Sequence, residues 1–146
     1  MTQRKDIIPA GGAIFTNDDE LAIFEEEIAL RQQVAANYAR LFSSLQGAEG
    51  DAAIQPPYIE PHNTSVYAQY TIRVRDREAL QSKLKTTGIP TAVHYPILLN
   101  KQPAVADAKI SLPVGDAVAQ QVISLPMGPY LSAHSVQLTV QSLLAV

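Results

Sequence analysis

One stretch decides how this chain folds, Gly88-Ile89-Pro90-Thr91-Ala92-Val93-His94-Tyr95-Pro96. Its apolar residues predict a strand from Ile89 to His94, with Pro90 at the first residues of the strand or at a sheet edge. Prolines stiffen the chain on both sides. The stretch therefore places His94 and Tyr95 side by side where the chain leaves a sheet and enters a long connection, a position that often carries function.

The composition is typical of a single folded domain, and the net charge does not indicate a nucleic acid or membrane partner. The chain has 146 residues, of which 47% are hydrophobic and 17% are charged, so it is able to bury a core. A net charge of −3 gives no electrostatic reason to expect nucleic acid or an anionic membrane as partner. The absence of cysteine excludes disulfides and thiolate chemistry. With no membrane-spanning apolar run and no secretory signal, we expect a cytoplasmic domain.

A long amphipathic helix is predicted after a short lead-in. Residues 1–16 show no clear period and form the lead-in segment, which leaves residues 17–146 as the domain. Asn17 and Glu20 have the spacing of a capping box at a helix start. Up to Gly47, apolar residues then recur at helical spacing, at Leu21, Phe24, Ile28, Val34, Tyr38, Leu41 and Leu45. The acidic run Glu25-Glu26-Glu27 is interpreted as the solvated face of this helix rather than as an acidic site.

The middle of the chain predicts a strand and a short helix after a proline-rich linker. Alternation of apolar and polar residues predicts a half-buried strand from Val66 to Val74. Asp76 is the expected N-cap of the short helix, which carries Leu80 and Leu84 and ends at Gly88.

The last third predicts a helix from about Val114 to Val122, a strand from Val122 to Leu125 stopped by Pro126, and a closing helix capped by Ser132. The strands are few and the connections short, which favours a small antiparallel or mixed sheet over a parallel one. The predicted fold class is therefore α+β, with helices packed on one face of the sheet.

The order and spacing of these motifs resemble a known enzyme family. Three segments are similar to the C-terminal half of the DegT-type, pyridoxal-phosphate-dependent nucleotide-sugar aminotransferases, namely Gly88 to Pro96, Asn100-Lys101-Gln102-Pro103-Ala104 and Ser124-Leu125-Pro126-Met127. Within that family the chain looks most like the members that aminate UDP-linked 3-keto-hexuronic acids. The resemblance covers roughly Leu21 to the C-terminus. It implies the α+β small domain of fold-type-I aminotransferases.

The resemblance implies a substrate-binding role for His94 and Tyr95, because the matching pair in the family reaches the sugar of the nucleotide-sugar substrate. Both side chains combine an apolar ring with a polar tip, which suits contact with a sugar and with its hydroxyl or carboxylate groups. Without the resemblance, a lone histidine at a strand end is more often a hydrogen-bonded structural residue. Met127 is a third candidate, either in contact with the nucleotide base or sugar or packed in the core.

The sequence positions of the other titratable residues match no known catalytic or metal-binding motif. Lys101 is the most tempting lysine for binding pyridoxal phosphate, but neither the family's Ser-rich motif nor a phosphate-binding glycine loop surrounds it. It is interpreted as a solvated loop residue, with contact to the anionic groups of the substrate as the alternative. Arg73 and Arg75 are interpreted as surface residues of a strand, with phosphate contact as the alternative. The three histidines are His62, His94 and His134. They lie far apart in the sequence and have no carboxylates at the spacing of metal ligands, so we expect no bound metal.

The chain departs from the family pattern in several places. Gly128 stands where the family motif Ser-Leu-Pro-Met-His-Pro-Tyr has a histidine, so any substrate contact of that histidine is lost. The residues from Ile14 to Glu20 do not match the Gly-x-Asn-x-Arg motif that reaches the neighbouring subunit's active site in the family. The family's cofactor-bearing large domain has no counterpart in this sequence. A truncated gene, a mobile fragment or a redeployed domain would each explain these departures.

These features predict a small-domain fragment of a sugar aminotransferase. The reaction implied for the intact enzyme is transfer of an amino group, commonly from glutamate, to a keto-sugar nucleotide. The chain alone is expected to bind no cofactor, to catalyse nothing and to bind a nucleotide sugar weakly. The alternative is a stand-alone, non-enzymatic module that binds nucleotide sugars or other proteins.

Self-association is also expected. In the family the small domain packs on a large domain, so a chain without one leaves apolar surface uncovered. The long helix around Phe24, Ile28 and Tyr38 has more apolar side chains than a small sheet covers, and Ile7 and Ile8 add others. Two-fold pairing is the commonest way to cover such a surface, so we expect a homodimer.

Overall fold

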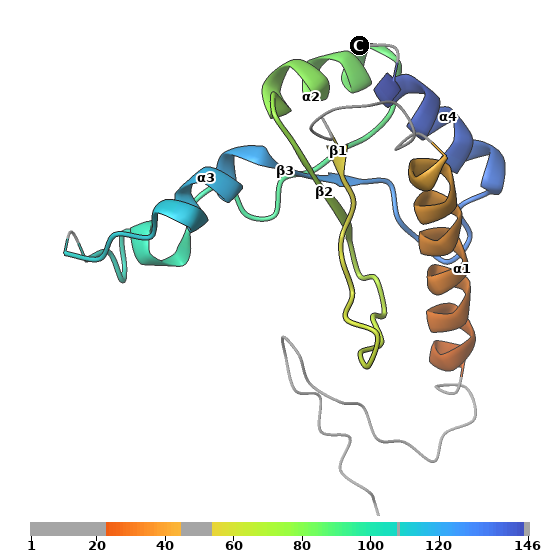
Figure 1. Ribbon diagram of the computed structural model, residues 1–146, viewed down its shortest axis with the longest axis horizontal. Coiled ribbons are helices and arrows are strands. Elements are labelled where there is room, and N and C mark those ends of the chain that lie inside the picture. The colour runs from red at the N-terminus through yellow and green to blue at the C-terminus, as the bar shows by residue number, and fades with distance from the viewer. Residues whose placement is uncertain (1–22, 45–53, 108, 145–146) are drawn as a thin grey trace, which may run out of the picture.

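The computed structural model describes residues 23–44, 54–107 and 109–144 (Figure 1). In chain order its elements are α1 (Ile23–Ser43), β1 (Ile54–Gln55), β2 (Tyr70–Val74), α2 (Arg77–Thr86), the 3-10 helix η1 (Leu99–Lys101), α3 (Pro113–Gln121), β3 (Val122–Leu125) and α4 (Ala133–Leu144). The strands form one antiparallel sheet in the order β1-β2-β3. The α+β prediction is confirmed, and the sheet is antiparallel. In the described part of the chain, no helix has the length and apolarity to cross a membrane.

The two faces of the sheet differ because side chains alternate along β2 and β3. One face is apolar and almost fully buried, and it carries Tyr70, Ile72, Val74, Ile123 and Leu125. The opposite face carries Thr71 and Ser124, which the strand register sets against each other. The sheet thus separates a hydrophobic core from a polar surface.

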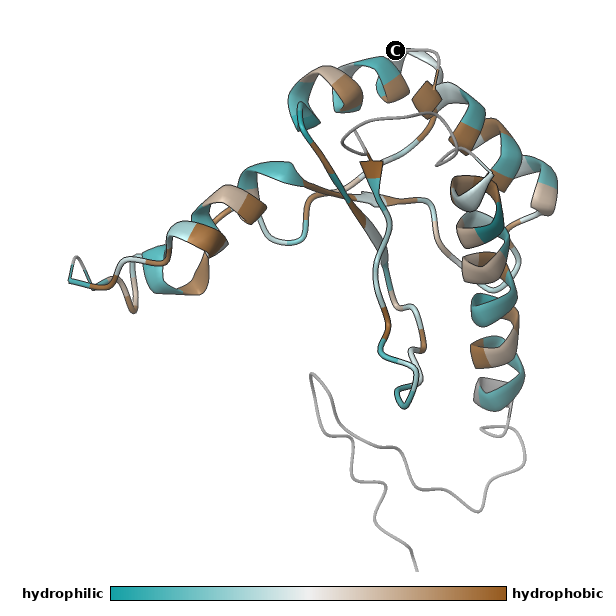
Figure 2. Ribbon diagram, in the orientation of Figure 1, coloured by the Kyte–Doolittle hydropathy of each residue, from teal (hydrophilic) through white to brown (hydrophobic). Residues whose placement is uncertain are grey.

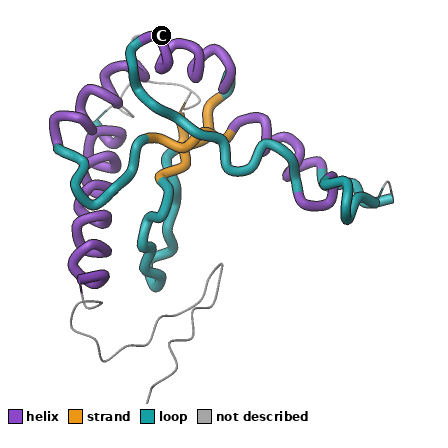
Figure 3. Tube along the Cα trace, turned by 180° about the vertical axis from the view of Figure 1, so that it is seen from behind, coloured by secondary structure: helices purple, strands orange, loops and turns teal. Residues whose placement is uncertain are grey.

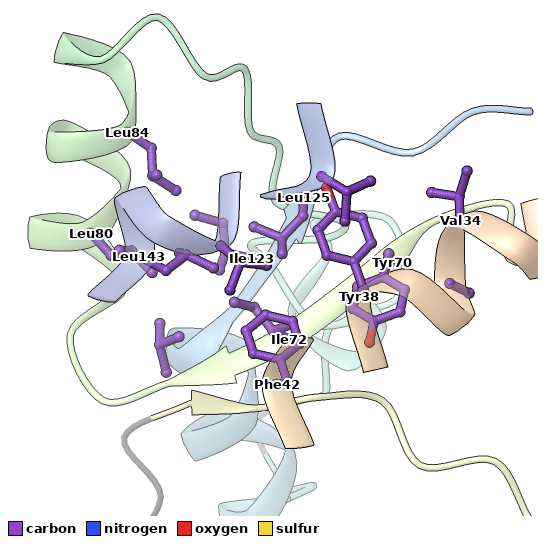
Figure 4. Close-up of a cluster of buried hydrophobic side chains, with 14 residues drawn as sticks. Val34, Tyr38, Phe42, Tyr70, Ile72, Leu80, Leu84, Ile123, Leu125 and Leu143 are labelled. Atoms are coloured by element: carbon purple, nitrogen blue, oxygen red, sulfur yellow. The ribbon is translucent and has the colours of Figure 1, made fainter. Parts of the chain in front are cut away.

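Helices α1, α2 and α4 pack on the apolar face (Figures 1 and 4). Their buried side chains join those of β2 and β3 in one cluster, with Val34, Ala35, Tyr38 and Phe42 from α1, Leu80 and Leu84 from α2, and Val136, Val140 and Leu143 from α4. This confirms that helices cover one face. In contrast, α3 and η1 project away from the sheet on the side opposite α1 and α4 (Figures 1 and 3).

Tyr38 ties α1 to both long strands. Its side chain is fully buried, although the sequence suggested an uncovered helix surface here, and its ring stacks on that of Tyr70 with 4.7 Å between centroids. The Tyr38 hydroxyl donates to the backbone carbonyl of Pro126, just after β3, at 2.9 Å. Burial raises the pKa of Tyr38 to about 12, so its hydroxyl remains a neutral donor at neutral pH.

Local signals set most element boundaries as predicted. The Asp76 carboxylate accepts from the backbone N–H of Ala79 at 2.9 Å, and the Ser132 hydroxyl accepts from the backbone N–H of Ser135 at 3.1 Å. Gly88 follows α2 with a φ of 75°. The strand from Val122 to Leu125 is confirmed residue for residue. The predicted lead-in, the capping box and the side chains of Leu21, Phe24 and Leu45 lie outside the described residues.

The predicted strand from Ile89 to His94 is wrong. Only Ala92 pairs with β3, through two backbone hydrogen bonds to Ser124 of 2.8 and 3.2 Å. This antiparallel register sets Pro90 opposite Pro126, and neither proline has an N–H with which to extend the ladder. The stretch is therefore a single bridge that holds the segment before His94 against β3.

The strand predicted from Val66 begins only at Tyr70. Tyr67 has a φ of 45°, which is incompatible with an extended strand, and Val66 is half exposed. This segment instead follows α1, where the Gln32 side chain donates to the Ser65 carbonyl at 3.2 Å. The two-residue strand β1 was not predicted, because it lies at the start of a proline-rich linker that shows no alternation.

Replacing Tyr38 tests the link between α1 and β3. We expect Tyr38→Phe to lower the free energy of unfolding by about 1–2 kcal/mol, because the Pro126 carbonyl loses its donor. Tyr38→Ala should cost about 3–5 kcal/mol, since the ring is lost as well. Urea denaturation measures both. Tyr58→Phe is the control, because that ring is 75% exposed, and it should change stability by less than about 0.5 kcal/mol. Equal effects of Tyr38→Phe and Tyr58→Phe would contradict the stabilising role of the Pro126 contact.

Candidate functional site

A solvent-open hollow of about 260 Å³ lies at the sheet edge where Ala92 pairs with Ser124. Its walls come from the residues before β2, from the segment leading to His94, and from the end of β3 and the residues after it. The lining residues are Ala68, Gln69, Pro90, Thr91, Ala92, His94, Ser124, Leu125, Pro126 and Met127. The structure thus brings together His94 and Met127, two of the three binding residues predicted from the sequence.

His94 is anchored by hydroxyl groups on the polar face of the sheet. Its Nδ1 lies 3.2 Å from Ser124 Oγ, and Ser124 Oγ lies 2.9 Å from Thr71 Oγ1. Ser124 is only 4% exposed, whereas His94 is exposed. The second ring nitrogen, Nε2, makes no hydrogen bond to the described residues. It is the polar atom that His94 has left for a ligand.

Tyr95 contacts His94 but does not line the hollow. The edge of one ring meets the face of the other, with 5.9 Å between the centroids. The Tyr95 side chain is 75% exposed, and the peptide bond between the two residues is cis. Met127 both lines the hollow and packs against the hydrophobic core, so the two roles considered from the sequence are compatible.

Sequence reasoning missed three polar residues of the hollow, Gln69, Thr91 and Ser124. Ser124 did carry a signal, because it is the one polar residue of the apolar run from Val122 to Leu125, and a buried hydroxyl needs hydrogen-bond partners. Gln69 and Thr91 lie within the two segments predicted as strands from Val66 to Val74 and from Ile89 to His94, and a polar residue in a predicted strand gives no sign of a binding role.

The hollow has no charged residue in its lining. Lys101, the sequence candidate for a cofactor-binding lysine, forms an ion pair with Asp116 of α3 instead. A pyridoxal phosphate site needs a lysine amine and a set of donors for the phosphate, and the residues of the hollow do not fit that group. Arg73 donates to the Gln121 side chain at 2.8 Å. Among the described residues, no three potential metal ligands lie close enough to hold an ion.

The sequence matches the model of the DegT/DnrJ/EryC1/StrS aminotransferase family over residues 19–144. The chain belongs to this family. It is 46% identical over 172 residues to the UDP-2-acetamido-2-deoxy-3-oxo-D-glucuronate aminotransferase of Pseudomonas aeruginosa. This alignment covers 91% of this chain and 46% of that enzyme. It is 27% identical over 125 residues to the dTDP-3-amino-3,6-dideoxy-alpha-D-galactopyranose transaminase of Aneurinibacillus thermoaerophilus, which covers 85% of this chain and 32% of that enzyme.

Solved structures of DegT-family aminotransferases share the fold. The crystal structure of DesV from S. venezuelae, in complex with a ketimine intermediate, matches with a TM-score of 0.73 and 32% identity over 85% of this chain and 33% of that one. A family aminotransferase from Brucella abortus matches with a TM-score of 0.72 and 29% identity over 86% of this chain and 32% of that one. This chain therefore spans about a third of the solved enzymes, and the predicted resemblance to one part of a DegT-type aminotransferase is confirmed.

The alignment with the Pseudomonas enzyme is also longer than the part of this chain that it covers. The covered 91% of 146 residues is about 133 residues, whereas the alignment runs over 172, so about 39 aligned positions have no residue here. The alignment with the Aneurinibacillus enzyme runs over 125 positions for about 124 residues of this chain. Relative to the Pseudomonas enzyme, this chain therefore lacks about 39 positions within the aligned region.

Gly128, which stands where the family motif has a histidine, has room for a side chain. A Cβ at this position would meet no atom within 4 Å, and the backbone is outside the left-handed region. We expect Gly128→His to change the free energy of unfolding by less than about 0.5 kcal/mol. The contrasting variant is Gly88→Ala, which places a Cβ at a φ of 75° and should cost about 1–2 kcal/mol. Urea midpoints measure both variants, and an equal loss in each would show that residue 128 does not accommodate a side chain.

Proposed function

We propose that this chain forms one wall of the sugar pocket of a pyridoxal-phosphate-dependent nucleotide-sugar aminotransferase. In the complete enzyme, the proposed reaction moves an amino group, commonly from glutamate, to a UDP-linked keto-hexuronic acid. The chain alone is proposed to bind the nucleotide sugar weakly and to catalyse nothing. The observation that carries the proposal is that His94 and Met127 face one hollow in a chain of the DegT family. The name of the Pseudomonas relative supports the sugar class.

The lining of the hollow suits a sugar. Gln69, Thr91 and His94 offer hydrogen-bond donors and acceptors for hydroxyl groups. Pro90, Pro126 and Met127 offer apolar surface to the C–H groups of a sugar ring. Tyr95 is proposed to add its ring to this contact, because it lies against the ring of His94 and is 75% exposed.

The hollow also explains why binding by this chain alone should be weak. It is open to solvent, and its lining has no cation to meet the diphosphate or the carboxylate of a UDP-hexuronic acid. The charged contacts of the complete site must then come from residues other than those of the hollow. A ligand held mainly by neutral hydrogen bonds in an open site has a dissociation constant of about a millimolar or weaker.

Titration with UDP-glucuronic acid, followed by amide chemical shifts, tests this binding role. We expect small, saturable shifts that cluster at Gln69, Thr91 and His94, with a dissociation constant of about a millimolar or weaker. His94→Ala should remove them. His134→Ala is the matched control, because His134 is exposed in the first turn of α4 and does not line the hollow. Shifts that cluster elsewhere and persist in His94→Ala would contradict the proposal.

The cofactor proposal has its own test. Because the hollow contains no lysine and Lys101 is paired with Asp116, we expect the chain to retain no pyridoxal phosphate. Mixing the two, dialysing and recording the absorbance spectrum should leave no band from lysine-bound cofactor. Lys101→Ala serves as the control variant and should behave in the same way. A stoichiometric band that survives dialysis and maps to a single lysine would overturn this proposal.

We also propose that the protein is a cytoplasmic homodimer. Among the described residues, six of the twelve exposed large hydrophobic side chains lie on one segment. We call this segment, the described residues of 97–114, the α3 arm, and Figure 2 colours it by hydropathy. Leu99 is 77% exposed and Val114 is 76% exposed. An open apolar hollow of about 500 Å³ on this arm is lined by Leu98, Leu99, Asn100, Val105 and Leu112. Apolar surface of this kind favours association, and a second copy is the proposed partner.

Light scattering across a dilution series tests the dimer. We expect a mass near twice that of the chain at high concentration, falling on dilution. Leu99→Lys combined with Val114→Lys should shift the equilibrium to the monomer, because charges would have to be buried in the interface. The control is Leu138→Lys on α4, where the side chain is 47% exposed, and it should leave the mass unchanged. A monomeric mass at every concentration would rule out the homodimer.

A further inference from the structure

Ser124 makes hydrogen bonds through both its backbone and its side chain, although it is 4% exposed. Its backbone N–H donates to the Ala92 carbonyl at 2.8 Å, and its carbonyl accepts from the Ala92 N–H at 3.2 Å. Its hydroxyl lies 2.9 Å from the Thr71 hydroxyl and 3.2 Å from His94 Nδ1. Ser124 therefore fixes both the segment that carries His94 and the imidazole ring itself.

The available protons decide which way these hydrogen bonds run. If Thr71 donates to Ser124 and Ser124 donates to His94 Nδ1, each hydroxyl proton has an acceptor. If His94 Nδ1 carried the proton and donated to Ser124, the Ser124 proton would go to Thr71. The Thr71 proton would then have no acceptor among the described residues. Thr71 is partly exposed, so its proton would then be left to solvent. The first arrangement, in which both hydroxyl protons have acceptors within the protein, is preferred.

We infer that Ser124 is a positioning residue for His94. It donates to Nδ1 and holds the imidazole in the tautomer protonated at Nε2, while Thr71 sets the direction of the Ser124 hydroxyl. Nε2 then presents a hydrogen-bond donor to the ligand. The ligand atom that meets it is an acceptor, such as a hydroxyl or carboxylate oxygen of the sugar. The assignment of Ser124 stands on the free protein, and only the identity of this ligand atom rests on the function proposed above.

The tautomer is measurable without any ligand. Nitrogen-15 NMR of the imidazole, recorded with the ring neutral, distinguishes a protonated nitrogen from an unprotonated one. In the unmodified chain we expect Nε2 protonated and Nδ1 unprotonated for His94. In Ser124→Ala the two resonances should move toward each other, because the ring loses its fixed partner and samples both tautomers. Protonation of Nδ1 in the unmodified chain, or unchanged resonances in Ser124→Ala, would overturn the inference.

Variants of Thr71 provide a second test in case Ser124→Ala fails to fold. Thr71→Val keeps the shape of the side chain and removes its hydroxyl, so it should produce a partial mixture of tautomers. Thr71→Ser keeps the hydroxyl and should restore the single tautomer. Thr139→Val removes a buried hydroxyl from α4, where Thr139 donates to the Ser135 carbonyl, and should leave His94 unchanged. Identical His94 spectra in Thr71→Val and Thr71→Ser would overturn the role given to Thr71.

Binding of UDP-glucuronic acid separates this inference from the proposed function. If His94 contacts the ligand, Ser124→Ala should weaken binding severalfold, whereas Thr139→Val should not. A chain that shows the expected tautomer and its loss in Ser124→Ala, yet binds no UDP-glucuronic acid, would support the positioning role of Ser124 and refute the sugar site. A chain that binds the sugar but holds no single tautomer would refute the positioning role alone.

Discussion

The pairing of β3 on both of its edges is the constraint on which the rest of this structure depends. One edge bonds to β2 along the whole strand, and the other bonds to Ala92 alone. Side chains alternate along β3, so Ile123 and Leu125 enter the core while Ser124 enters the candidate site. A slip of one residue would exchange the two sets. The packing of the core and the geometry around His94 are thus fixed by the same four-residue strand.

The hollow exists because the outer edge of β3 is not paired further. Continuing the register of the Ala92 bridge would set Pro90 opposite Pro126, and neither proline supplies the N–H that another pair would need. The chain leaves the sheet on both sides of this point, and the space between the departing segments is the hollow. The Tyr38 hydroxyl binds the Pro126 carbonyl from the core side. One proline thereby ends the strand, lines the hollow and anchors α1.

The two surfaces that the fold leaves open differ in character. The first hollow has a mixed and uncharged lining, which suits a neutral part of a ligand, whereas the hollow on the α3 arm has a mainly apolar lining, which suits a protein surface. The solved enzymes of the family are about three times as long as the region that this chain matches. Two open surfaces fit a chain that corresponds to only a part of such an enzyme. Burial of apolar area gains roughly 25 cal/mol per Å², so the arm has a physical reason to be covered.

The sequence by itself determined the elements whose signals are local. Helix caps at Asp76 and Ser132, the strand from Val122 to Leu125 and the helical spacing of α1 act within a few residues, so they were readable from the pattern. Resemblance to the family indicated His94, Tyr95 and Met127. Only the tertiary structure decided that Ile89 to His94 is a single bridge and that Thr71, Ser124 and His94 form one hydrogen-bonded chain. Thr71 and Ser124 are 53 positions apart, and they meet because of strand register, which alternation alone does not specify.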